Sequence, residues 1–178
     1  TRGLPTLWLR FREMQSNAGE IANYLVDASH VQSVNYPGLE NNRGGYSYGE
    51  NARRLFTGWD GEFAPGYMLS FFLEGRTEED QTLRAERFLQ YIARKNDQFW
   101  NRSMVVAVSL GGFVTLIERP GGGTHATINP AERALWGIRG GLLRLSIGTS
   151  PFEDTVSMLE KAMRYAFQKG SQSLRRSG

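Results

Sequence analysis

One arginine lies in the middle of an apolar segment near the end of the chain. Arg144 belongs to the run Leu142-Leu143-Arg144-Leu145, which has the composition of a buried strand. A charge in such a place is costly unless it is paired or points into a cleft. A planar guanidinium can hold an α-carboxylate through two parallel hydrogen bonds, so carboxylate binding is the chemistry that Arg144 suggests. The alternative is a solvent-facing arginine, since side chains alternate along a strand.

A second candidate is a glycine-containing turn earlier in the chain. The segment Ser109-Leu110-Gly111-Gly112 interrupts an extended stretch. Glycines in a turn let the backbone come close to a ligand. A sharp bend between two strands is an equally good interpretation. The chain has no GxGxxG or GxxxxGK pattern, so the segment is not interpreted as a nucleotide loop.

Side chains that act as bases or cofactor anchors are few. His125 invites a general-base or metal interpretation, but His30 is the only other histidine and lies far away in the sequence. A metal site is therefore not expected, and we interpret His125 as a structural residue that holds a loop beside the site. The only lysines are Lys95, Lys161 and Lys169, all in polar surroundings or on a helix end. They are expected to be solvated surface residues.

Composition limits the class of protein. The 178 residues carry 21 basic and 18 acidic side chains, a net charge of +3 without a clustered basic stripe, so a nucleic-acid partner is not expected. No apolar run approaches the roughly 18 residues of a membrane span. The absence of cysteine fits a cytoplasmic chain. Because the sequence starts at Thr1 rather than at a methionine, we expect it to begin inside a longer protein.

The elements that must position these residues follow from hydrophobic spacing. Helices are predicted at 5–27, 50–56, 79–95 and 151–168, with a short one after Asn129, and strands at 31–36, 67–73, 104–108, 114–118 and 142–147. Capping boxes are predicted at Thr77–Asp80 and Ser150–Glu153, and Asn129 is predicted to cap the short helix. The fold class is α/β: one mainly antiparallel sheet of four or five strands, with helices packed on one face.

Six stretches of the chain, in this order, resemble one enzyme family. They are 2–7 with Arg10; 36–39; 68–71; 107–113 with 115–116; 124–126; and 130–133 with 137–138 and 141–148. The family is that of the pyridoxal-phosphate (PLP) dependent trans-sulfuration enzymes: cystathionine γ-synthase, cystathionine lyases, methionine γ-lyase and O-acylhomoserine sulfhydrylases. The resemblance runs from residue 2 to about residue 167.

The resemblance implies the small C-terminal domain of a fold-type I PLP enzyme. On this basis 1–28 is a long connecting helix, 29–169 the substrate-binding α/β domain and 170–178 a disordered tail. The N-terminal PLP-binding domain of the family, with its Schiff-base lysine, is absent from these residues, so no catalytic residue is assigned. PLP is the implied cofactor of the full-length enzyme, and the isolated fragment is expected to be inactive.

The resemblance also assigns roles to particular residues. Arg144 matches the arginine that binds the substrate carboxylate, and Thr115 matches a Ser or Thr whose hydroxyl lies near that carboxylate. Val114 departs from the family, which has glutamate there, and this leaves the reaction type open. The implied substrate-binding positions are Arg144, Thr115, Val114, Ser109 and Leu110. Gly111, Gly112 and His125 are implied to be structural residues near the site.

The function implied is β- or γ-elimination or replacement on cystathionine, a related sulfur amino acid or a homoserine ester. Methionine γ-lyase or O-acylhomoserine sulfhydrylase activity is the close alternative. A non-catalytic module that keeps this fold for binding or assembly is a further alternative. The implied partners are a small amino-acid substrate and further copies of the chain, in a homodimer or homotetramer.

Overall fold

The computed structural model describes residues 3–40, 48–95 and 103–168. The predicted tail at 170–178 lies outside them. The elements in chain order are α1 (Leu7–Asp27), β1 (Val31–Asn35), α2 (Gly49–Phe56), β2 (Met68–Leu73), α3 (Glu78–Lys95), β3 (Met104–Val106), β4 (Thr115–Glu118), the 3₁₀ turn η1 (Pro120–Gly122), α4 (Pro130–Leu135), β5 (Leu142–Ser146) and α5 (Phe152–Phe167).

The strands form one five-stranded sheet with the order β1-β2-β5-β4-β3. Three neighbouring pairs are antiparallel, and β3 and β4 alone are parallel. This confirms the predicted α/β class and the mainly antiparallel sheet. The last strand in the sequence, β5, lies in the centre of the sheet. Its residues therefore have a strand neighbour on both sides.

Alternation along the strands separates two faces of the sheet. Leu143 and Leu145 are paired with Phe71 and Leu69 of β2, and all four are buried. We call this side the helix face. Arg144 points to the other side. We call that side the Arg144 face; its polar members are Ser70, Glu118, Arg144 and Ser146.

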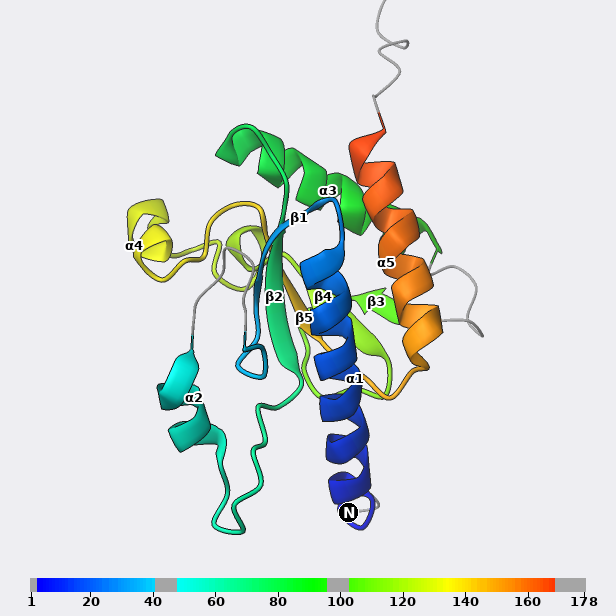
Figure 1. Ribbon diagram of the computed structural model, residues 1–178. Helices are drawn as coiled ribbons and strands as arrows, with labels where there is room; N and C mark the ends of the chain where they lie inside the picture. The colour runs from blue at the N-terminus through cyan, green and yellow to red at the C-terminus, as the bar shows by residue number, and fades with distance from the viewer. Residues whose placement is uncertain (1–2, 41–47, 96–102, 169–178) are drawn as a thin grey trace, which may run out of the picture.

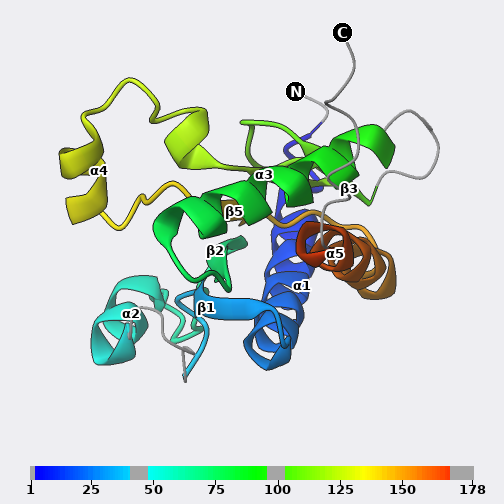
Figure 2. The same ribbon diagram turned by 90° about the horizontal axis from the view of Figure 1, so that it is seen from above.

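Three helices pack on the helix face. Figures 1 and 2 show α1, α3 and α5 beside the sheet, with the small helices α2 and α4 set apart from them. Phe88 of α3 meets Phe71 of β2 edge to face, with ring centroids 6.0 Å apart. Burying a large apolar side chain contributes roughly 1.5–3 kcal/mol, so each such residue of this layer adds appreciably to the stability. The helix contribution to the core consists of Ala18, Ile21, Ala22, Leu25, Ala85, Phe88, Ile92, Leu159, Ala162, Met163 and Ala166.

The helix ends agree with the predicted caps in part. Thr77 accepts a hydrogen bond from the Asp80 amide at 3.2 Å, but the Asp80 carboxylate accepts from the Arg76 amide instead of completing the box. The Asn129 side chain caps α4 as predicted, by accepting from the Ala131 amide at 2.9 Å. The cap predicted at Ser150 is wrong. Pro151 has extended backbone angles, so α5 begins at Phe152 and no side chain caps it.

Candidate functional site

Arg144 lies at the centre of the sheet. It is opposite Ser70 on β2 and opposite Glu118 on β4. Its neighbours Leu143 and Leu145 are fully buried against the helices, so alternation forces the guanidinium to the other side. The side chain remains 24% exposed there. Of the two interpretations of this arginine, an ordinary solvent-facing side chain does not match its surroundings.

The partner of Arg144 is a buried carboxylate that sequence analysis missed. A guanidinium nitrogen of Arg144 lies 2.5 Å from an oxygen of Glu118, whose side chain is only 5% exposed. A charge as buried as that of Glu118 is tolerated because it is paired and hydrogen-bonded. The only signal in the sequence was an acidic residue at the end of an extended apolar segment.

A small cavity opens beside the guanidinium. Its volume is about 230 Å³, and its walls are mostly apolar apart from Arg144, His125 and Ser70. The lining residues are Met68, Leu69, Ser70, Pro120, His125, Ile138, Leu142 and Arg144. A guanidinium carries several donors in one plane and accepts nothing, so a carboxylate is the group that this cavity is suited to hold.

His125 is brought to this cavity by the turn that follows η1. It lines the cavity with Arg144, and its Nδ1 lies 2.9 Å from the hydroxyl of Thr124. The structure thus joins two residues that lie far apart in the sequence. A place beside the site agrees with the predicted structural role of His125, which itself stays a prediction. Nowhere in 3–40, 48–95 and 103–168 do three or more His, Cys, Asp or Glu gather in a way that could hold a metal ion.

The turn at 109–114 is fastened to the end of the Arg144 face. The Gly111 amide donates to the Ser146 hydroxyl at 3.1 Å. Gly111 has φ +72°, and a Cβ there would lie 3.3 Å from the Tyr67 hydroxyl, so glycine is needed at this position. Ser109 and Leu110 are exposed. Ser109, Leu110, Gly112 and Val114 do not line the Arg144 cavity, and their predicted roles stay predictions.

Thr115 lies on the helix face, in register with Met104 and on the same side of β4 as Ile117. It is 1% exposed, and its hydroxyl accepts a hydrogen bond from the Gly148 amide at 3.1 Å. The structure therefore does not bring Thr115 together with Arg144. Its hydroxyl instead joins the start of β4 to the segment after β5. A contact between Thr115 and substrate stays a prediction.

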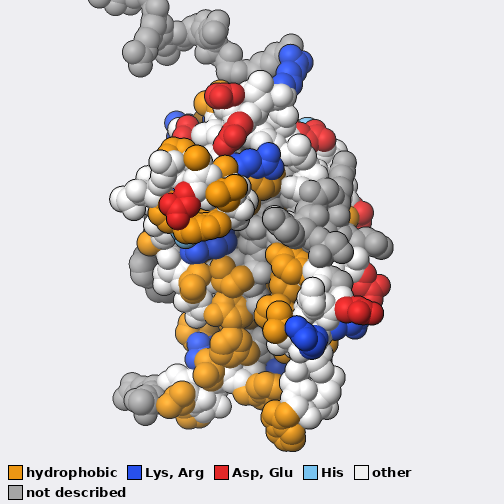
Figure 3. All heavy atoms as spheres, turned by 90° about the vertical axis from the view of Figure 1, so that its left-hand side faces the viewer, with side chains coloured by type: hydrophobic (Ala, Val, Ile, Leu, Met, Phe, Trp, Pro, Cys, Tyr) orange, Lys and Arg blue, Asp and Glu red, His pale blue; other side chains and the backbone are white. Residues whose placement is uncertain are grey.

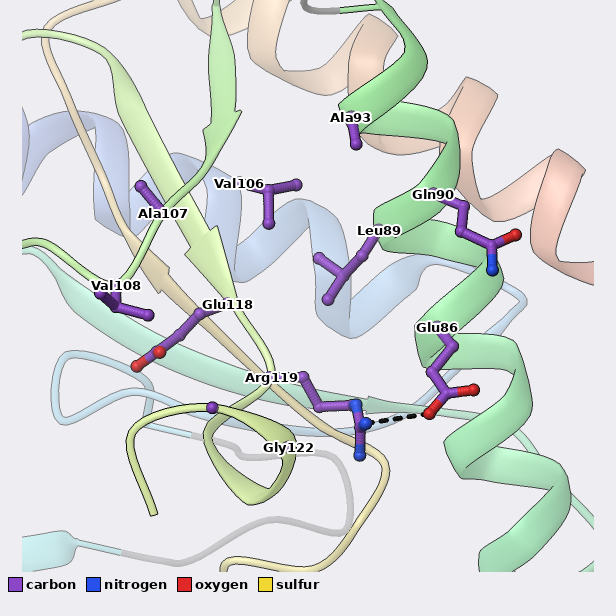
Figure 4. A pocket seen from close by; sticks show the side chains of 11 residues that line it. Glu86, Leu89, Gln90, Ala93, Val106, Ala107, Val108, Glu118, Arg119 and Gly122 are labelled. Atoms are coloured by element: carbon purple, nitrogen blue, oxygen red, sulfur yellow. Dashed lines mark hydrogen bonds and ion pairs between the residues drawn. The ribbon is translucent and has the colours of Figure 1, made fainter. Parts of the chain in front are cut away.

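A larger groove lies between α3 and the β3 edge of the sheet (Figure 4). Its volume is about 610 Å³, and much of its wall is apolar. On one side Arg119 pairs with Glu86 of α3 at 2.9 Å. Figure 4 shows Arg119 and Glu118 diverging: Arg119 points to α3, and the Glu118 carboxylate points toward Val108. The groove and the Arg144 cavity thus lie on either side of the Glu118–Arg144 pair.

The described residues do not fit the covalent attachment of PLP. Lys95 ends α3 and Lys161 is on the outer side of α5, and both are exposed and outside the Arg144 cavity. Lys169 lies outside the described residues. The described part of the site therefore offers an arginine that lines a cavity but no amine for a Schiff base. Within the described ranges, no helix combines the length and the apolar character needed to cross a membrane.

The fold is one α/β layer in which an arginine of the central strand faces a cavity, and this fold is shared with PLP enzymes. The chain belongs to the Cys/Met metabolism PLP-dependent enzyme family, whose profile matches residues 1–164. PLP is the cofactor of that family. The resemblance inferred from the sequence motifs is thereby confirmed.

Individual relatives give the same picture. The chain is 32% identical to cystathionine gamma-lyase of Bos taurus, over 93% of this chain and 35% of the relative. It is 35% identical to cystathionine beta-lyase of Lactococcus lactis subsp. cremoris, over 91% of this chain and 36% of the relative. The structure matches cystathionine gamma synthase of Xanthomonas oryzae pv. oryzae in complex with cystathionine. That match has a TM-score of 0.71 and 34% identity, and it covers 93% of this chain and 36% of that one. The chain thus spans about a third of the length of these relatives.

Proposed function

We propose that this chain supplies the substrate-carboxylate site of a PLP-dependent enzyme that acts on cystathionine or a related sulfur amino acid or homoserine ester. The observation that carries the proposal is the position of Arg144. It is held on the central strand, ion-paired on one side and open to a cavity on the other. A surface arginine needs neither a buried partner nor a cavity.

The role of the chain's own residues is binding and orientation. Two hydrogen bonds from the Arg144 guanidinium fix the plane of an α-carboxylate, and this determines which bond at Cα is turned toward the reacting group. The mostly apolar walls of the cavity lower the local polarity and strengthen the contact between the charges. Electron withdrawal from Cα is the chemistry that PLP supplies when it is bound. We propose that the lysine that anchors PLP belongs to a part of the protein outside these residues.

The substrate class is supported by the names of the relatives. They include cystathionine gamma-lyase, cystathionine beta-lyase and L-methionine gamma-lyase, the last from Fusobacterium nucleatum at 33% identity. Both named substrates, cystathionine and methionine, carry an α-carboxylate, and none of these names distinguishes one reaction for this chain. Cleavage of a C–S bond in cystathionine is our leading assignment. Action on methionine or O-acetylhomoserine is the alternative, because Val114 removes a charge from the turn next to the site.

The test uses the intact protein loaded with PLP. L-cystathionine, L-methionine and O-acetylhomoserine with sulfide are supplied separately, and 2-oxo acid, ammonia and thiol products are measured. We expect turnover of L-cystathionine above the other two. Borohydride reduction followed by peptide mapping locates the pyridoxyl-lysine. The proposal is wrong if PLP is trapped on a lysine of this chain, or if none of the three substrates reacts.

We further propose that the intact protein forms a homodimer or homotetramer in the cytoplasm. Figure 3 views the side that carries α2 and α4 and shows apolar side chains gathered on it. Among the strongly exposed apolar residues are Leu55 (71%) and Trp59 (101%) of the α2 region, and Trp8 (61%) and Leu9 (66%) of α1. Exposed apolar surface of this kind supports burial against another surface. Sedimentation of the active protein as a monomer would contradict the oligomer.

A further inference from the structure

The contacts of Glu118 form a chain that ends at the guanidinium. Glu118 and Arg144 are direct partners in the register of β4 and β5, so their side chains leave the sheet at the same point and on the same side. One guanidinium nitrogen contacts a Glu118 oxygen at 2.5 Å. No second acidic residue pairs with Arg144 in the part of the chain that the structure describes. Glu118 is thus the acidic partner of the guanidinium in the described part of the chain.

Burial makes the Glu118 carboxylate a stiff anchor. Its side chain is 5% exposed, against 24% for Arg144. Rotation of the carboxylate away from its partners would leave a buried charge unpaired, which is strongly unfavourable. The guanidinium, in contrast, has five N–H donors, and only part of this set faces Glu118. Because Arg144 lines the cavity, its remaining donors are available to a ligand.

Thr124 contacts the Glu118 carboxylate, and His125 contacts Thr124. The Thr124 hydroxyl lies 3.3 and 3.4 Å from the two Glu118 oxygens and 2.9 Å from Nδ1 of His125. An ionised carboxylate only accepts, so the Thr124 hydroxyl is the donor in its contact with Glu118. Which of Thr124 and His125 donates in the other contact depends on the tautomer of the His125 ring.

We propose that Glu118 is a positioning residue. It orients the guanidinium of Arg144 so that the N–H groups that do not contact Glu118 face the substrate carboxylate. Thr124 and His125 in turn hold Glu118 in place. The proposal rests on the carboxylate-binding role of Arg144. Glu118 touches no reacting atom in this scheme, so its effect on activity passes through Arg144. A residue that served only to stabilise the sheet would leave the kinetics of the folded enzyme unchanged.

The first measurement is steady-state kinetics of the intact PLP-loaded protein with L-cystathionine. Glu118→Leu should lower kcat/KM by about ten- to a hundredfold, mainly through KM, because a guanidinium misplaced by about 1 Å loses its fit to the carboxylate. Glu118→Gln keeps an acceptor oxygen for the guanidinium and should recover most of this loss. Thr124→Val, which removes only the supporting hydroxyl, should lower kcat/KM by about two- to fivefold.

The second measurement is a double-mutant cycle with Arg144→Lys. If Glu118 acts through the guanidinium, Glu118→Leu and Thr124→Val should each change kcat/KM by less than about twofold in the Arg144→Lys variant, which has no guanidinium. If the losses in kcat/KM of the single variants multiply in the double variants, the proposal is wrong. Should Glu118→Leu fail to fold, the Thr124→Val variant decides. If its kcat/KM equals that of the parent, the proposal is wrong.

A matched control is available in the neighbouring pair. Glu86→Gln removes another carboxylate that is bound to an arginine, Arg119, without contact to Arg144. It should leave KM and kcat within about twofold of the parent. The outcomes also separate the two proposals. An unimpaired Arg144→Lys variant refutes the carboxylate site itself, whereas an impaired Arg144→Lys with an unimpaired Glu118→Leu refutes only the positioning role.

Discussion

On β5, Leu143 and Leu145 point to the helix face and are fully buried, whereas Arg144 between them points the other way and is 24% exposed. The five residues of β5 (Leu142–Ser146) thus contribute to the core on one side of the sheet and to the candidate site on the other. Glu118 on β4 repeats the pattern, because its neighbour Ile117 is in the core. A shift of one residue along the strand would exchange the two sets. Substitutions on the two faces should therefore have separable effects on activity and on stability.

The largest effect is expected at Arg144. In the intact protein, Arg144→Ala should lower kcat/KM for L-cystathionine by roughly 30- to several-thousandfold, equivalent to about 2–5 kcal/mol, through loss of a bidentate charged contact. Arg144→Lys preserves a charge opposite Glu118 but not the fork, so it should recover only part of the activity. Steady-state kinetics with the PLP content measured alongside tests this. A value for Arg144→Ala within about twofold of the parent would exclude carboxylate binding by Arg144.

The adjacent residue should show the opposite behaviour. Leu145→Ala removes a fully buried side chain from the central strand and should lower the free energy of unfolding by about 2–5 kcal/mol. The variant that remains folded should keep KM close to the parent value. Urea unfolding followed by fluorescence measures the stability, and kinetics at low temperature measures KM. A large rise in KM without loss of stability would contradict the separation of the two faces.

A smaller loss is expected where α1 meets the segment after β5. The Asn17 side chain is 7% exposed and donates to the carbonyls of Gly148 and Ser150, each at 3.2 Å. Asn17→Leu leaves these carbonyls without their donor and should cost about 1–3 kcal/mol of stability. Thermal unfolding measures the change. Glu20→Gln, on the exposed side of the same helix, is the control and should be neutral.

The smallest effect appears only at alkaline pH. Burial raises the pKa of Tyr36 from 10.0 to about 12, and its hydroxyl donates to the Gly66 carbonyl at 2.8 Å. The unfolded chain therefore loses this proton first, and the contribution of Tyr36 to stability, complete below pH 10, is lost as pH rises toward 12. Tyr36→Phe should show a weaker fall in unfolding free energy over this range. Tyr24, whose pKa burial also raises to about 12, needs the parallel Tyr24→Phe control.

Local sequence patterns were sufficient for the elements and for Arg144. The apolar run around Arg144 and the period of α5 are properties of a few consecutive residues, and each predicted strand exists with shifts of one or two residues at its ends. Leu83 shows where such patterns fail. It is an apolar residue of α3 but is 55% exposed, because the helix turns Ala85, Phe88 and Ile92 to the core.

The partners of the site residues could not be predicted in the same way. The pairing of Glu118 with Arg144 depends on the register of β4 against β5, which are separated by η1 and α4. Alternation within a strand that starts at Thr115 turns its side chain to the helix face, a placement that the sequence did not indicate, and its predicted contact with substrate stays a prediction. Cross-strand register and the first residue of a short strand are set by tertiary packing, and spacing alone does not contain them.

The turn at 109–114 has a consequence for amide hydrogen exchange. Its Gly111 amide donates to the Ser146 hydroxyl, and its Phe113 carbonyl accepts from the Thr149 amide at 2.8 Å. The Gly148 amide, bound to Thr115, belongs to the same set of contacts. Release of these protons to solvent requires the end of β5 to separate from the turn, so the three amides should share one opening free energy in hydrogen exchange. A turn fastened in this way opens with the sheet, on the timescale of local unfolding, and not as an independent lid.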